Sequence, residues 1–127
     1  LVTDKTCRNI YLYDLQGREL AFIEQEIMTF LPRYHISRNG QEIAEIVKEF
    51  TFFKHEYSVS GLGWSVHGDF WDHEYEITDN GREIASVSKE WMTWGDSYEL
   101  DIAEDKNELL ALAVVLAIDC AVAQNSN

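Results

Sequence analysis

Basic residues are scarce in this chain of 127 residues, because ten Lys and Arg stand against 23 Asp and Glu and give a formal net charge of −13. The few basic residues are also scattered singly along the sequence. Such a surface repels nucleic acid phosphates and anionic lipid headgroups. We therefore expect no nucleic acid partner, and the net charge disfavours peripheral contact with lipid.

Cysteine is rare as well, with Cys7 and Cys120 the two in the sequence. One pair in a chain of this size is not a disulfide framework, and no secretory segment opens the sequence. We interpret both as small buried hydrophobic residues of a reduced, cytoplasmic protein. The sequence also lacks a nucleophile-elbow motif, a phosphate-binding loop and a Rossmann glycine pattern. It therefore predicts a single non-enzymatic domain over residues 1–127, with no cofactor.

A hairpin repeat organises most of the chain. Three segments share the pattern G-[RQ]-E-[LI]-A-x-[IV]-x-[KQ]-E, at residues 17–26, 40–49 and 81–90. Each starts at a tight turn, and the Asn-Gly dipeptides of the second and third copies favour the positive φ angles of a type I′ hairpin. An aromatic residue follows each glycine by 13 positions and a tyrosine by 17. Gly17, Gly40 and Gly81 are therefore interpreted as structural residues.

The pattern predicts an antiparallel meander. The expected strands are 9–15, 19–28, 33–38, 42–50, 55–60, 63–70, 73–79, 83–91 and 96–102. Adjacent apolar pairs such as Leu20-Ala21 and Ile43-Ala44 break the alternation of a simple strand, which indicates bulges or strands covered on both faces. About nine sequential strands should curl rather than lie flat.

Residues Asp105–Ala123 predict a helix instead. Asp105 and Glu108 form a potential capping box, and no polar residue interrupts Leu109–Ile118. A membrane span needs about 20 apolar residues, so we expect no transmembrane anchor. The concave face of a curled sheet could surround the helix, with the narrow strip Ala113, Ala117 and Ala121 allowing close approach of strands. Asp119, near the helix end, is predicted to be a structural latch between helix and sheet.

Several segments together resemble the LURP-one-related family, which shares the tubby C-terminal-like fold with the phospholipid scramblases. The segments that carry the resemblance are the hairpin repeat, Gly68-Asp69-Phe70 with His73-Glu74-Tyr75, Lys89 to Trp94, Tyr98 to Ile102, and the helix ending Ala117-Ile118-Asp119. The resemblance implies a closed or nearly closed barrel of about twelve strands, about nine of them here, around a buried hydrophobic C-terminal helix. It also implies another hairpin before the position of Leu1, which is either absent from this protein or removed from this chain. If it is absent, the barrel would have an open edge for self-association.

Two groups of polar residues are candidate metal sites. By analogy with the scramblases, Asp96, Asp101 and Asp105 form a weak candidate for a cation site, although Asp96 and Asp101 are expected on opposite strand faces. The segment His67-Gly68-Asp69-Phe70-Trp71-Asp72-His73 offers His67, Asp69 and His73, but the repeat context explains it without chemistry. The repeated aromatics Phe30, Phe53, Trp91 and Trp94 are interpreted as packing hairpins together rather than as a binding rim. No metal site is favoured.

The predicted function is a non-enzymatic binding or scaffold domain. The family resemblance does not identify a ligand. The alternative is a membrane-associated, lipid-binding or scramblase-like protein, which is suggested by fold analogy alone.

Overall fold

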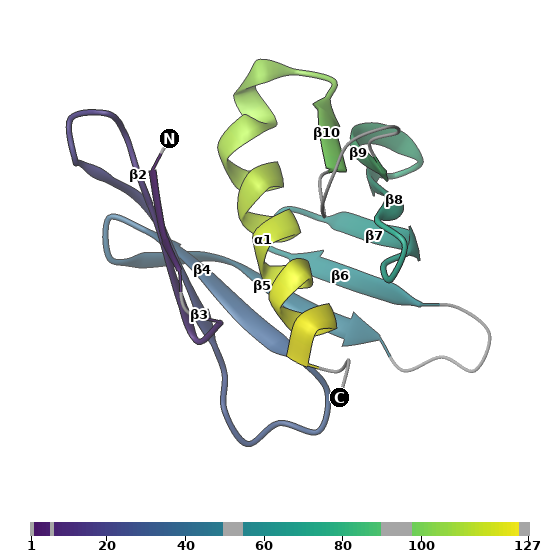
Figure 1. Cartoon of the computed structure of the whole chain (residues 1–127), viewed down its shortest axis with the longest axis horizontal. Coiled ribbons are helices and arrows are strands. Elements are labelled where there is room, and N and C mark those ends of the chain that lie inside the picture. Colours follow the sequence, from purple (N-terminus) through teal and green to yellow (C-terminus); the bar gives the residue numbers. More distant parts are fainter. Residues whose placement is uncertain (1, 6, 50–54, 90–97, 125–127) are drawn as a thin grey trace.

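The computed structural model describes residues 2–5, 7–49, 55–89 and 98–124, and within these ranges it contains ten strands, a 3-10 turn and one α-helix (Figure 1). The strands are β1 (Val2–Lys5), β2 (Asn9–Tyr13), β3 (Glu19–Gln25), β4 (Arg33–Arg38), β5 (Gln41–Glu49), β6 (Glu56–Ser60), β7 (Trp64–Asp69), β8 (Glu74–Asp79), β9 (Arg82–Lys89) and β10 (Tyr98–Ile102). The 3-10 turn η1 (Asp105–Asn107) leads into helix α1 (Glu108–Gln124).

All ten strands belong to one antiparallel sheet, in the order in which they follow one another along the chain. The mostly β meander with a C-terminal helix is therefore confirmed. The described sheet has one strand more than the nine predicted, because β1 pairs with β2 ahead of the first predicted strand. Within the described ranges β1 pairs with β2 alone and β10 with β9 alone. The sheet thus curls around the helix but does not close into a barrel (Figure 1).

The predicted turns have the backbone that their sequences favour. Asn39-Gly40 and Asn80-Gly81 have φ angles of 52° and 76°, and of 50° and 84°, as a type I′ hairpin requires. The Gln16-Gly17 turn is built differently, because the side chain of Asp14 accepts hydrogen bonds from the backbone N–H groups of Gln16 and Arg18, both at 2.9 Å. The hydrogen bond from the Arg18 backbone is the main cause that lowers the pKa of Asp14.

A β-bulge follows the turn in every copy of the repeat. The register shifts between Leu12 and Tyr13, between Ile36 and Ser37, and between Ile77 and Thr78. In each case the unpaired residue on the partner strand is the Leu or Ile of the repeat, namely Leu20, Ile43 and Ile84. The bulges predicted from the adjacent apolar pairs are therefore present.

Helix α1 runs along the concave side of the sheet and contacts β2, β3 and β10 (Figure 1). The strip Ala113, Ala117 and Ala121 is completely buried, as the close approach of strands requires. Leu112 and Leu116, in contrast, are half-buried. The expectation that strands enclose every side of the helix is therefore wrong, because the open sheet leaves one stripe of it less covered.

The helix also begins later than predicted. Glu104 is the N-cap of η1 and makes no side-chain cap hydrogen bond, and α1 begins only at Glu108. Asp105 thus lies in the 3-10 turn and does not cap the helix in the predicted way. By length and composition Asp105–Gln124 could cross a membrane, with a mean hydropathy of 1.7, but the buried core helix of a soluble protein meets the same criteria.

Candidate functional site

Two of the three acidic residues predicted as a weak cation site, Asp101 and Asp105, lie in the described part of the chain, on different elements. Asp101 is exposed on β10 opposite Ser86, and Asp105 is exposed in η1. Asp96 lies outside the described residues. The described residues do contain a group with the spacing of metal ligands, but neither Asp101 nor Asp105 belongs to it.

The segment His67 to His73 also does not form a common site. His67 Nε2 lies 2.8 Å from Glu76 Oε1 on the neighbouring strand. The carboxylate of Asp69 accepts a hydrogen bond from the backbone N–H of Asp72, at 3.1 Å. His73 instead faces the helix. The three side chains therefore serve separate local roles.

His73 and Asp119 lie next to each other between the β7–β8 turn and the end of α1. Nδ1 of His73 is 3.8 Å from Oδ1 of Asp119, and both side chains are largely buried. His73 has a φ angle of 54°, in the left-handed region. Asp119 is therefore placed where the predicted latch between helix and sheet would have to be.

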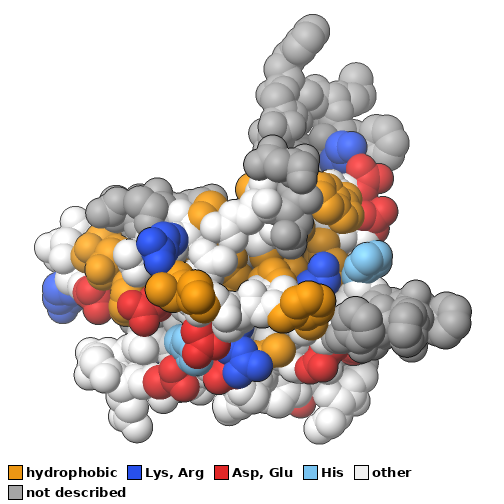
Figure 2. All heavy atoms as spheres, turned by 90° about the horizontal axis from the view of Figure 1, so that it is seen from below, with side chains coloured by type: hydrophobic (Ala, Val, Ile, Leu, Met, Phe, Trp, Pro, Cys, Tyr) orange, Lys and Arg blue, Asp and Glu red, His pale blue; other side chains and the backbone are white. Residues whose placement is uncertain are grey.

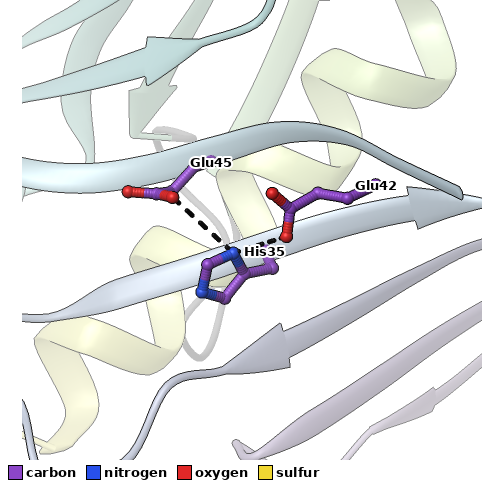
Figure 3. A group of neighbouring side chains, drawn as sticks. All are labelled: His35, Glu42 and Glu45. Carbon is purple, nitrogen blue, oxygen red and sulfur yellow. Dashed lines mark ion pairs between the residues drawn. The ribbon is translucent and has the colours of Figure 1, made fainter.

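Sequence reasoning missed the group formed by His35, Glu42 and Glu45 (Figure 3). His35 comes from β4, and both glutamates come from the neighbouring β5. Nδ1 of His35 lies 2.7 Å from Glu42 Oε1 and 3.8 Å from Glu45 Oε2. One ligand atom from each residue lies within 4.8 Å of the others. This combination of an imidazole and two carboxylates is chemically suited to a divalent metal ion.

The bulge at Ile43 explains why the sequence did not reveal this group. Residues three apart in a regular strand point to opposite faces. The bulge inserts one residue between Glu42 and Glu45 that has no partner, so both side chains point outward. It also pairs His35 with Glu45, whereas an unbroken register from the pair Arg38–Gln41 would put His35 opposite Ala44.

Arg33 and Glu26 form a second layer around the group. Arg33 Nη1 lies 2.8 Å from Glu45 Oε1, and Arg33 Nε lies 3.4 Å from Glu26 Oε2. The other oxygen of Glu26 is 3.7 Å from Nε2 of His35. Arg33 thus holds two carboxylates whose remaining oxygens face the two ring nitrogens of His35.

The β3–β4 loop beside this group exposes large apolar side chains. Ile27, Met28 and Phe30 are 56%, 97% and 92% exposed. For Phe30, the prediction that the repeated aromatics pack hairpins together is therefore wrong, because the loop extends away from the sheet at the bottom of Figure 1. Trp91, Trp94 and Phe53 lie outside the described residues.

Two shallow hollows flank the base of the loop, with Glu26 lining both. One, of about 420 Å³, is lined also by Arg8 and Ile27. The other, of about 380 Å³, includes Phe30 and Lys48. The view from below shows apolar side chains at this end of the molecule side by side with acidic ones (Figure 2). Apolar groups and charged groups of both signs therefore share one surface.

Comparisons with known proteins identify the class of this protein. The model of the LURP-one-related family matches residues 2–119, so the chain belongs to that family. It is also similar to the uncharacterized protein YxjI of Bacillus subtilis (strain 168), with 40% identity over 111 residues, which cover 87% of this chain and 68% of the relative. No solved structure matches the chain.

Proposed function

We propose that this LURP-one-related chain is a non-enzymatic, cytoplasmic binding domain whose partner is a protein segment that carries both basic and apolar side chains. The observation that carries the proposal is the exposure of Met28 and Phe30 in the β3–β4 loop, at 97% and 92%. Large apolar side chains exposed together commonly mark interaction surfaces. The proposal places the contact at this loop and the two hollows at its base.

Charge supports a basic partner. The formal net charge of the chain is −13. The hollows themselves have charges of both signs, because Glu24, Glu26 and Arg8 line one, and Glu26, Arg33 and Lys48 line the other. An acidic surface attracts cationic partners and repels anionic ones. Apolar contacts with the loop would supply affinity, while the net negative charge of the whole chain would favour a cationic partner.

A model peptide tests the proposal. We would titrate an amphipathic Lys/Leu peptide into the protein and compare it with a Glu/Leu peptide of the same length. The Lys/Leu peptide should bind, binding should weaken with salt, and the double variant Met28→Ser, Phe30→Ser should bind at least ten-fold more weakly. The control is Leu15→Ser, which removes a side chain that is 81% exposed in the β2–β3 turn. Equal binding by the wild type and the double variant would contradict the proposal.

The second candidate is peripheral lipid binding, which the same exposed loop could support by inserting Met28 and Phe30 into a membrane interface. Sedimentation with neutral phosphatidylcholine vesicles separates the two. Vesicle binding that is lost in the double variant, together with no preference for the Lys/Leu peptide, would favour lipid over a protein partner.

A further inference from the structure

We propose that His35, Glu42 and Glu45 bind one divalent transition-metal ion, for which Zn²⁺ is the test case. The ligand atoms would be Nδ1 of His35 and one carboxylate oxygen from each glutamate (Figure 3). Nδ1 is buried and lies 2.7 Å from Glu42 Oε1, in a contact that lacks the geometry of a hydrogen bond. The ring nitrogen therefore points into the group, toward one oxygen of each glutamate.

The spacing of the group suits a metal ion. Zinc bonds of about 2.0–2.1 Å in tetrahedral geometry place a ligand nitrogen and a ligand oxygen roughly 3.3 Å apart. The two distances from Nδ1, 2.7 Å to Glu42 and 3.8 Å to Glu45, lie on either side of this value. The side chain of Glu42 is 54% exposed, so rotation of this side chain can adjust its position at little cost. Binding thus requires side-chain motion and no change in the sheet.

The second layer would orient the ligands. A metal-bound histidine commonly donates its other ring N–H to a carboxylate. Glu26 Oε1, at 3.7 Å from Nε2, is in the right place to accept that hydrogen bond after a small movement. Arg33 holds the other oxygen of Glu45 at 2.8 Å, which leaves Oε2 free for the metal. Arg33 also offsets part of the negative charge that the carboxylates bring together.

The other hairpin copies serve as internal controls. The pair at the position of His35 and Glu45 is Tyr11 and Phe22 in the first copy, where the rings stack with centroids 4.7 Å apart. In the third copy the pair is Glu76 and Ser86. The position of Glu42 holds a glutamate in all three copies, the others being Glu19 and Glu83. Since all three copies also have the same bulge, the histidine and the second carboxylate, His35 and Glu45, are what the shared backbone does not require.

The ligand set defines the class of ion. One imidazole with two carboxylates suits a borderline divalent ion such as Zn²⁺, whereas Ca²⁺ takes six to eight oxygen ligands. Three protein ligands would leave at least one coordination position open to water or to a side chain of another molecule. A metal ion bound here could therefore also coordinate a group from another molecule that docks on this face of the sheet.

Calorimetric titration of the full chain with ZnCl₂ tests the proposal. The titration uses a Cys7→Ser background, because the half-buried thiol of Cys7 could itself bind Zn²⁺. One equivalent of Zn²⁺ should bind and should raise the melting temperature. His35→Ala should abolish both effects, and Glu42→Gln should weaken binding at least ten-fold. Glu42→Gln is the safer variant, because it changes an exposed side chain and leaves the Arg33–Glu45 pair intact.

His67→Ala is the matched control. His67 also lies on a strand with a carboxylate 2.8 Å away, but it does not belong to a group of three ligands. This variant should bind Zn²⁺ as the wild type does. The proposal fails if the wild type binds no stoichiometric Zn²⁺, if Glu42→Gln and His35→Ala bind it unchanged, or if His67→Ala loses as much affinity as His35→Ala. The readout is independent of any protein partner, so it stands or falls separately from the proposed function.

Discussion

On the inward side of the hairpins β2–β3, β4–β5 and β8–β9 the same kinds of residue recur, whereas the outward side, apart from one repeated glutamate, differs from copy to copy. Ala21, Ala44 and Ala85 follow the three bulges and are at most 3% exposed, and each is followed two residues later by a buried Ile or Val. The outward positions one residue after these alanines hold Phe22, Glu45 and Ser86. The inward side packs against one helix, while the outward side has no such common neighbour.

This difference indicates where specificity resides. Packing against α1 limits the inward positions to side chains of suitable volume. The outward positions have the same register after the bulge, but packing against the helix does not limit which side chains they hold. The second copy is therefore distinguished by His35 and Glu45 on its outward side, beside the repeated glutamate Glu42, and by the β3–β4 loop that precedes it.

Substitution of one inward residue and one outward residue should give the largest difference in the free energy of unfolding. Ile46 is completely buried, and Ile46→Ala should lower the free energy of unfolding by about 2–5 kcal/mol. Glu42→Gln on the outward side, measured without metal, should change it by about 0.5 kcal/mol or less. Urea unfolding of both variants checks this, and equal losses would show that the two sides contribute alike.

The bulge of the second copy should depend on Gly61. This residue has a φ angle of +91°, and an added Cβ would clash with the carbonyl oxygen of Ile43, the bulged residue. Gly61→Ala should cost about 3 kcal/mol, from left-handed strain and the clash together. Gly63→Ala is the control, with a φ of +71° and open space around the added Cβ, and should cost about 1–2 kcal/mol. Urea unfolding measures both variants. Similar losses of unfolding free energy in Gly61→Ala and Gly63→Ala would show that the clash with Ile43 contributes nothing.

Two inward tyrosines should make the fold sensitive to alkali. Burial raises the pKa of Tyr57 from 10.0 to about 12, and burial also raises that of Tyr34, with further contributions from Cys120, Cys7 and Tyr57. The folded state therefore holds these protons more tightly than the unfolded state. The contribution of these tyrosines to the free energy of unfolding should be constant below pH 10. Above pH 10 it should fall by about 1.4 kcal/mol per pH unit for each tyrosine. Urea unfolding at several pH values should show a smaller slope in Tyr57→Phe, and an unchanged slope would refute the assignment.

A smaller effect than at Ile46 or Gly61 is expected where the β7–β8 turn meets the helix. Asp119→Ala should lower the free energy of unfolding by about 1–2 kcal/mol, because Asp119 lies beside His73 and is 16% exposed. Thermal denaturation measures the loss. In His73→Asn, which tolerates the left-handed backbone, the same substitution should cost less. An unchanged melting temperature of Asp119→Ala would eliminate the latch.

Much of the fold could be predicted from local patterns. The strand predicted at 33–38 matches β4, and the turns at Asn39-Gly40 and Asn80-Gly81 have the expected backbone. These features depend on alternation and turn chemistry between near neighbours in sequence. The cluster around His35 could not be predicted in this way, because it depends on the register across two strands after a bulge. The exposure of Phe30 and the partial exposure of Leu112 and Leu116 depend on how far the sheet curls.

The sequence by itself determined the repeat, its glycine turns, the bulged pairs and the apolar helix, because each arises from backbone preferences and side-chain period over a few residues. Only the tertiary structure decided that the sheet stays open in the described part of the chain and that His35, Glu42 and Glu45 meet on its outer face. The physical reason is that a one-residue bulge reverses which side of the strand each later residue faces. Its consequences are visible only when the paired strands are placed side by side.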